Sequence, residues 1–208
     1  MTDRPMIAVS QRVDSIPARG ETRDALDQRL IRWVLALGAS PLPVPNTLDE
    51  ALAGWLQRLS PVAVLLSGGN DIGTSPERDR TEAFLIDRAA AKSLPLLGIC
   101  RGMQMLAHHA GGALVRLSGH AGCRHPLRGE VAGVRGEAIE VNSFHDWGLR
   151  DNPPGYRPLA TAADGTLEAM RHERHRWEAW MWHPEREAEF NAADIAHARE
   201  LLLGSRQS

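Results

Sequence analysis

A cysteine stands between two glycines in the stretch PLLGICRGMQML, residues 95–106. An apolar run ends at Cys100, and a helix-like pattern begins directly after it. Gly98-Ile99-Cys100-Arg101-Gly102 has the G-x-nucleophile-x-G form of the strand-to-helix turn of serine hydrolases, where the sharp bend requires glycines. A thiol there would be exposed at a helix N-terminus, whose partial positive charge favours the thiolate. Free cysteines are also common packing residues, so the motif alone leaves both interpretations open.

A cysteine nucleophile needs a base, and nine histidines are present. His183 directly follows the apolar run AWMW, so we expect it at the end of a strand. Glu185, two residues further on, could orient the imidazole as the third member of a triad. The alternative is a surface loop that carries an unrelated histidine and glutamate.

Two further segments fit the same chemistry. Gly68-Gly69 follows an apolar run and can present backbone N–H groups, which with the Arg101 N–H could form an oxyanion hole. An ordinary Gly-Gly turn is the alternative. The segment VNSFHD lies at another expected strand end, where its polar groups could bind a substrate or cap a turn; they are Asn142, Ser143 and His145.

Short apolar runs alternate with helical spacing in the first half of the chain, which favours α/β architecture around a mostly parallel sheet. Parallel strands place ligands at their carboxyl ends, where Cys100 is expected. Expected strands cover 6–10, 62–67, 95–99, 113–117 and 137–145, with a hairpin of 165–171 and 176–182 and an extended segment at 41–46. Expected helices cover 26–37, 48–59, 76–93 (cap Ser75), 101–112 and 191–203 (cap Asn191).

The chain has 208 residues and a formal net charge of -2, which predicts one domain over 1–208 with no general attraction to nucleic acid or membranes. No segment approaches the roughly 20 apolar residues that span a bilayer. Two cysteines, Cys100 and Cys123, do not make a disulfide framework. We therefore expect a cytoplasmic protein.

SGGND, GICRGMQ and WHPE, in this order, resemble the class I glutamine amidotransferase family, over roughly residues 5–203. The resemblance implies a flavodoxin-like three-layer α/β/α sandwich with small antiparallel hairpin additions in its second half. RDxxE (Arg78, Asp79, Glu82), VNSFH and the DGTLEA to MWHPERE ending are similar to its stand-alone γ-glutamyl hydrolases, including the γ-glutamyl-γ-aminobutyrate hydrolases. SQR, RDALDQ, VPN and SGGNDI look closer to the γ-glutamyl-CDP-amidate hydrolases.

This resemblance implies Cys100 as nucleophile, His183 as base and then acid, and Glu185 as the residue that orients His183. Gly69 and Arg101 would offer oxyanion N–H groups. The implied substrate-binding residues are Gly68, Gln104, Asn142, Ser143 and His145. No metal or organic cofactor is required for such a hydrolysis.

The implied reaction releases glutamate and an amine from a γ-glutamyl amide. In the γ-glutamyl-CDP-amidate hydrolases the amine is cytidine diphosphoramidate, an intermediate of capsular phosphoramidate synthesis. A glutaminase subunit that passes ammonia to a partner synthetase is a second interpretation. Arginines that could meet a diphosphate, or simply aid solubility, are Arg78, Arg80, Arg101, Arg116 and Arg124.

A non-catalytic zinc-binding module is an alternative of another class. The candidate ligands are His108, His109, His120, Cys123 and His125. Adjacent histidines on a helix point in different directions, and no tight C-x2-C or H-x3-H pairing is present, so the spacing argues against this set.

Overall fold

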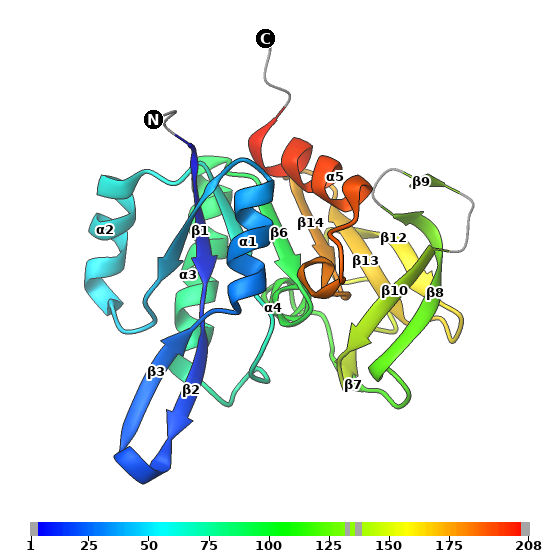
Figure 1. The fold of residues 1–208 in the computed structure, drawn as a ribbon, viewed down its shortest axis with the longest axis horizontal. Helices are drawn as coiled ribbons and strands as arrows, with labels where there is room; N and C mark the ends of the chain where they lie inside the picture. The colour runs from blue at the N-terminus through cyan, green and yellow to red at the C-terminus, as the bar shows by residue number, and fades with distance from the viewer. Residues whose placement is uncertain (1–3, 132–133, 136–138, 205–208) are drawn as a thin grey trace.

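The computed structural model of the protein describes residues 4–131, 134–135 and 139–204. A twisted sheet crosses the described part in the order β10-β8-β12-β13-β14-β6-β5-β1-β4, and β9 pairs with β8 (Figure 1). The first two residues of the strand expected at 137–145 lie outside the described residues. The sheet strands are β1 Met6–Ser10, β4 Ser40–Val44, β5 Ala63–Leu66, β6 Leu96–Ile99, β8 Ala121–Val131, β9 Val134–Arg135, β10 Ile139–Phe144, β12 Tyr156–Ala162, β13 Leu167–His172 and β14 Trp177–Trp180.

Strands β4, β1, β5, β6 and β14 run parallel, whereas β13, β12, β8 and β10 extend the sheet in antiparallel pairs. The hairpin expected at 165–171 and 176–182 is confirmed as β13 and β14. Strand β14 joins the two halves, because it also pairs with β6 in the register Trp180 to Ile99. The carboxyl ends of β6 and β14 therefore lie side by side.

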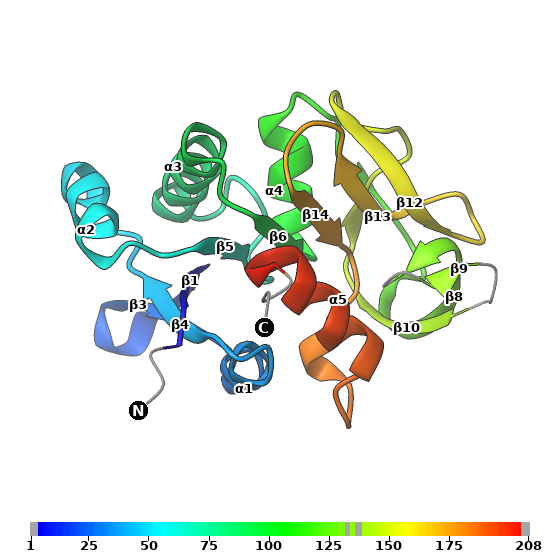
Figure 2. The same ribbon diagram turned by 90° about the horizontal axis from the view of Figure 1, so that it is seen from above.

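Helices cover both faces of the parallel half, with α1 and α5 on one face and α2, α3 and α4 on the other (Figure 2). Alternation along β1 divides the core accordingly: Ile7 and Val9 pack in the cluster that holds residues of α1 and α5, and Ala8 packs in the other. This confirms the three-layer α/β/α prediction. The helices are α1 Gln28–Ala36, α2 Leu52–Leu59, α3 Pro76–Lys92, α4 Arg101–His109 and α5 Ala192–Leu203, with 3-10 turns η1 Pro17–Arg19, η2 Asp49–Ala51 and η3 Pro184–Arg186.

The helix caps differ in how they form. The Asn191 side chain accepts hydrogen bonds from the N–H groups of Ala193 and Asp194, as an N-cap should. Ser75 stands at the N-cap of α3, but its hydroxyl makes no capping bond. Asp79 in the first turn instead accepts from the Gly73 N–H at 2.8 Å, so a side chain inside the helix secures the preceding loop.

Two small ribbons lie outside the main sheet. Strand β2 (Arg12–Ile16) pairs with β3 (Glu21–Ala25) in a hairpin that projects from the body (Figure 1), and β7 (Val115–Arg116) pairs with β11 (Trp147–Gly148). Asn70 anchors the hairpin by exchanging hydrogen bonds of 2.7 and 2.9 Å with the Val13 backbone. The helices of the described residues include none that is both long and apolar enough to cross a bilayer.

Candidate active site

Cys100 occupies a sharp bend between β6 and α4. Its φ of +51° and ψ of -104° lie where residues with a side chain are strained. Three backbone bonds hold the bend: the Cys100 N–H donates to the Trp180 carbonyl at 2.7 Å, and its carbonyl accepts from Met103 and Gln104. The structure thus has the strand-to-helix bend that the G-x-C-x-G pattern predicts. The expectation of an exposed thiol is wrong, because Cys100 is only 6% exposed.

The two glycines of this pattern are required by close packing. A Cβ atom at Gly102 would lie 2.3 Å from the Leu66 carbonyl oxygen, and one at Gly98 would lie 2.7 Å from the Gly102 carbonyl carbon. Neither position therefore has room for a side chain. The glycines let α4 start directly against the ends of β5 and β6, which places Cys100 at the carboxyl edge of the sheet.

His183 and Glu185 follow β14, the strand beside β6. The His183 Nδ1 lies 2.6 Å from Glu185 Oε1, and the ring also hydrogen-bonds to Cys100. Burial alone would lower the pKa of His183, but the hydrogen bonds to Cys100 and Glu185 raise it to about 9. The structure brings the three predicted catalytic residues together, with His183 protonated at neutral pH.

Asn142 on β10 fixes the backbone of His183 from the other side. Its amide oxygen accepts from the His183 N–H at 2.9 Å, and its amide nitrogen donates to the His183 carbonyl at 2.8 Å. Both ends of one peptide segment are held by one buried side chain. Substrate binding by Asn142 stays a prediction, and these contacts give it a positioning role.

The 67–70 loop passes directly over the imidazole. A Cβ atom at Gly68 would lie 2.6 Å from His183 Cε1, so only glycine fits there. Gly69 has a φ of +90°, which favours glycine as well. The backbone of this loop therefore reaches the reactive groups without intervening side chains, as an oxyanion hole needs.

Arg78 on α3 supports this loop from below. Its guanidinium donates to the carbonyl oxygens of Ser67, Gly68 and Gly69. It also pairs with Glu82 at 2.9 Å, with both side chains fully buried. Burial and repulsion by Arg12 lower the pKa of Arg78 to about 9, which leaves it charged at neutral pH. Arg78 is thus a structural clamp.

Arg101 places its backbone N–H in the first turn of α4, where helix N–H groups have no intrahelical partner. Its buried side chain pairs with Asp79 and Glu82. The expectation that Arg78 and Arg101 meet a diphosphate is therefore wrong, because both guanidinium groups are sealed in ion pairs with the RDxxE carboxylates.

The other predicted substrate-binding groups make internal bonds. Gln104 Nε2 donates to the Trp147 carbonyl at 2.9 Å, and the buried Ser143 hydroxyl donates to the His120 carbonyl. His145 Nδ1 also bonds to the Trp147 carbonyl, at 3.0 Å. The structure shows these residues bracing the 142–147 segment, and their contact with substrate remains a prediction.

A pocket of about 280 Å³ opens beside His183, Gly68 and Gly69. Its outer wall comes from the β2–β3 hairpin and from η3, which contribute Arg12, Asp14 and Arg186. Charged side chains of both signs therefore line this pocket. The sequence analysis did not identify Arg12 and Arg186 as pocket residues, although Arg12 lies in the SQR segment and Arg186 in MWHPERE.

The zinc set proposed from the sequence does not assemble as predicted. His109 bonds to Asp87 at 3.0 Å, and the Cys123 thiol donates to the Gly119 carbonyl at 3.1 Å. His120 and His125 do come together, but with His145 and Glu168. This grouping differs from the set considered in the sequence analysis, because His145 and Glu168 come from other segments of the chain.

The bend after a central parallel strand carries a cysteine, and a His-Glu pair follows the neighbouring strand. This arrangement is typical of α/β enzymes that use a cysteine nucleophile. The chain belongs to the glutamine amidotransferase class-I family, whose model matches residues 21–197.

Among curated relatives, the chain is 33% identical over 198 residues to the γ-glutamyl-CDP-amidate hydrolase of Campylobacter jejuni, covering 91% of this chain and 94% of the relative. It is 25% identical over 226 residues to the γ-glutamyl-γ-aminobutyrate hydrolase of Escherichia coli O157:H7, covering 89% and 87%. A solved structure of a candidate GMP synthase subunit from Thermoplasma acidophilum superposes with a TM-score of 0.75 at 21% identity, covering 97% and 94%. That likeness supports the fold.

Proposed function

We propose that the protein is a cysteine-dependent hydrolase that cleaves a γ-glutamyl amide to glutamate and an amine. The observation that carries this proposal is the hydrogen-bonded chain from Cys100 through His183 to Glu185 at the carboxyl edge of the sheet. No step of the proposed reaction uses a cofactor.

In the first half-reaction, the Cys100 thiolate attacks the γ-carbonyl carbon. The π electrons of the C=O bond move onto the carbonyl oxygen, and the Gly69 and Arg101 N–H groups stabilise the resulting negative charge. The C–N bond then breaks, and the departing nitrogen takes the proton from His183 Nε2. The products are a free amine and a glutamyl thioester on Cys100.

In the second half-reaction, neutral His183 removes a proton from water as the water oxygen attacks the thioester carbon. The C–S bond breaks, which frees glutamate and restores the thiolate beside a protonated imidazole. Glu185 keeps the ring in the same orientation through both steps.

For the amine, we propose cytidine diphosphoramidate, which makes γ-glutamyl-CDP-amidate the substrate and capsular phosphoramidate synthesis the pathway. The relative that is 33% identical to this chain is named for this activity, and the match covers almost its whole length. The pocket supports it, because Arg12 and Arg186 offer guanidinium groups that suit a diphosphate. Phe144 is 45% exposed and lies 5.8 Å from the His183 ring, where it could stack on a pyrimidine.

The test measures glutamate release from γ-glutamyl-CDP-amidate, γ-glutamyl-γ-aminobutyrate and glutamine by the purified protein, with 31P NMR for the phosphoramidate. We expect the highest kcat/KM for γ-glutamyl-CDP-amidate. Cys100→Ala and His183→Ala should each lower kcat at least about 10³-fold, because the triad acts as a unit. Cys123→Ala is the matched control and should keep full activity.

Full activity of Cys100→Ala would overturn the mechanism. A preference for γ-glutamyl-γ-aminobutyrate would keep the mechanism and replace the proposed amine. A preference for glutamine, especially one that needs a partner synthetase, would assign the protein to the ammonia-supplying subunits.

A further inference from the structure

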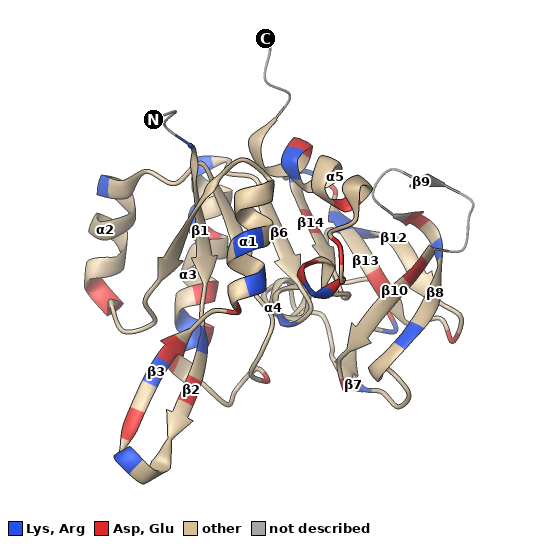
Figure 3. Ribbon diagram, in the orientation of Figure 1, with Lys and Arg blue, Asp and Glu red and all other residues tan. Residues whose placement is uncertain are grey.

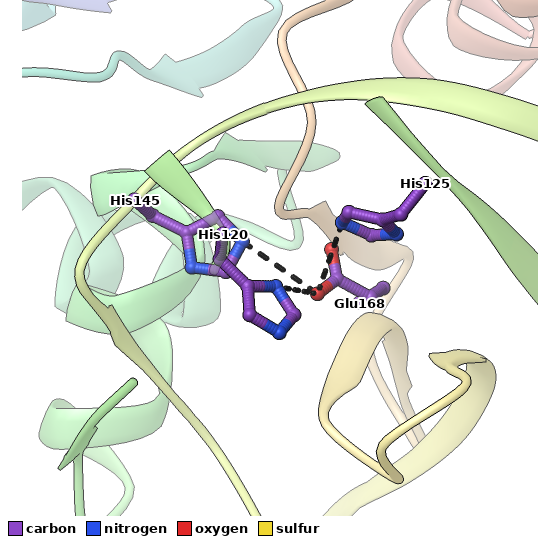
Figure 4. A group of neighbouring side chains, drawn as sticks. All are labelled: His120, His125, His145 and Glu168. Carbon is purple, nitrogen blue, oxygen red and sulfur yellow. Dashed lines mark ion pairs between the residues drawn. The ribbon is translucent and has the colours of Figure 1, made fainter. Parts of the chain in front are cut away.

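Four side chains outside the catalytic triad converge in the antiparallel half of the sheet (Figure 4). They are His120 before β8, His125 on β8, His145 after β10, and Glu168 on β13. One nitrogen or oxygen atom of each lies within 4.8 Å of those of the others. Glu168 is fully buried, and His145 and His120 are 3% and 6% exposed.

The outer nitrogens of two of these histidines face oxygen acceptors. His145 Nδ1 lies 3.0 Å from the Trp147 carbonyl, and His120 Nε2 lies 3.3 Å from a carboxylate oxygen of Asp164. A carbonyl or carboxylate oxygen accepts a hydrogen bond, so each outer nitrogen carries the N–H that donates it. In the neutral ring, the inner nitrogen then directs its lone pair toward Glu168. Such carbonyl and carboxylate partners are typical of metal-ligating histidines.

The inner atoms lack hydrogen bonds within the described residues. These atoms are His120 Nδ1, His145 Nε2, both ring nitrogens of His125, and both carboxylate oxygens of Glu168. Lone pairs and a carboxylate that face one another in a buried space repel unless a cation lies between them. A cation bound between these atoms would remove the repulsion and satisfy all of them at once.

The distances fit a metal ion. Glu168 Oε1 lies 3.3 Å from His120 Nδ1, 3.5 Å from His145 Nε2 and 3.8 Å from His125 Nε2. Zinc bonds of about 2.0 to 2.1 Å in a tetrahedron place neighbouring ligands roughly 3.3 Å apart. Small shifts of the side chains would thus close the four groups around one ion.

We propose that His120, His125, His145 and Glu168 bind one zinc ion. Three imidazole nitrogens and one carboxylate oxygen suit zinc better than the hard cations calcium and magnesium, which take oxygen ligands. Four protein ligands fill a tetrahedron, so the site is structural and leaves no position for an activated water.

Such an ion would join β8, β13 and the 142–147 segment. That segment holds His183 through Asn142, and its Trp147 carbonyl accepts bonds from both Gln104 and His145. Zinc would therefore stiffen the antiparallel half where it meets the catalytic histidine. The proposal concerns binding and does not depend on the proposed reaction.

The test uses untagged protein carrying Cys100→Ser, because the reactive thiolate could itself capture zinc. After chelator treatment and reloading with ZnCl₂, unbound metal is removed and zinc is measured by mass spectrometry. We expect one zinc per chain and a rise in Tm on loading. In the same protein Co²⁺ should give the visible bands of a tetrahedral site without a thiolate charge-transfer band.

His125→Ala, which removes a partly exposed ligand, should weaken zinc binding at least about 100-fold, because even outer partners of a ligand contribute 10- to 100-fold. Asp164→Asn keeps all four ligands and should weaken zinc binding about 10-fold. This variant still tests the proposal if His125→Ala does not fold. His109→Ala lies outside the cluster and should bind like the parent. No retained zinc, equal binding by His125→Ala, or a thiolate band from Cys123 would each overturn the proposal.

Discussion

At the scale of single residues, the candidate site concentrates charge in a buried space and compensates each charge locally. The imidazole of His183 bonds to both Cys100 and Glu185. Behind the 67–70 loop, Arg78 and Arg101 are balanced by the RDxxE carboxylates. The reacting atoms can thus change charge within a network that is already oriented and needs little rearrangement.

The raised pKa of His183 predicts how activity depends on pH. The folded value of about 9 lies above the ordinary 6.5, so the imidazolium that protonates the leaving amine persists through neutral pH. We expect kcat/KM to fall as pH rises through about 9. Protonation of His183 also stabilises the folded state. This contribution is fully present below about pH 6.5 and is lost as the pH rises through about 9.

Glu185→Gln tests the cause of that raised pKa. It removes the carboxylate that raises the pKa of His183, so the falling limb of kcat/KM should move to lower pH and the maximum should decrease. The exposed Glu189→Gln is the matched control. An unmoved limb in Glu185→Gln would show that another group controls the profile.

The grouping of Cys100, His183 and Glu185 could be predicted from the sequence, because Cys100 lies between glycines and His183 follows an apolar run. The histidine cluster could not, because His145 and Glu168 come from strands that only the folded sheet brings together. Likewise, no spacing distinguishes Arg78, which clamps a loop, from an exposed arginine such as Arg80.

At the scale of elements, apolar runs predicted β1, β5 and β6, because parallel strands covered on both faces are continuously hydrophobic. The β2–β3 hairpin escaped prediction, since its sequences RVDSI and ETRDA lack a continuous apolar run and the hairpin projects from the body. Its position depends on distant contacts, such as those between Asn46 and Asp24.

The packing of α4 against β5 gives a prediction for Gly102→Ala. The new Cβ would lie 2.3 Å from the Leu66 carbonyl oxygen, so backbone must move. We expect a loss of about 3 kcal/mol or more in the free energy of unfolding. We also expect a lower kcat, because Leu66 directly precedes the 67–70 loop. Urea denaturation measures the first effect.

Gly54→Ala in α2 is the control for this substitution. The nearest atom to its new Cβ is the Arg58 side chain at 3.8 Å, and alanine favours helices. It should raise stability by up to about 1 kcal/mol and leave kcat unchanged. If Gly102→Ala were equally benign, the close packing described for the bend would be incorrect.

At the scale of the whole molecule, the candidate pocket lies between the sheet edge and the projecting hairpin. Figure 3 shows acidic and basic residues interspersed along β2 and β3. Arg12 comes from this hairpin and Arg186 from the turn after His183, so the wall combines segments from opposite ends of the chain.

This arrangement predicts that Arg12→Ala and Arg186→Ala affect substrates unequally. Each should raise KM for γ-glutamyl-CDP-amidate roughly 10-fold, through a lost guanidinium-phosphate contact, and leave KM for glutamine nearly unchanged. Arg19→Ala, at the exposed end of the same hairpin, should change neither value. Equal effects on both substrates would place these arginines at the glutamyl group instead of the diphosphate.

The pairing of Trp180 with Ile99 sets the strand ends from which Cys100 and His183 extend, on neighbouring strands of one ladder. Main-chain alignment therefore governs the spacing of Cys100 and His183, whereas side chains on the rim would meet the proposed leaving group. In the proposed reaction, substitutions on the rim can change which amine is released without affecting bond cleavage. A shift of one residue in the pairing of β6 with β14 would abolish cleavage of every substrate.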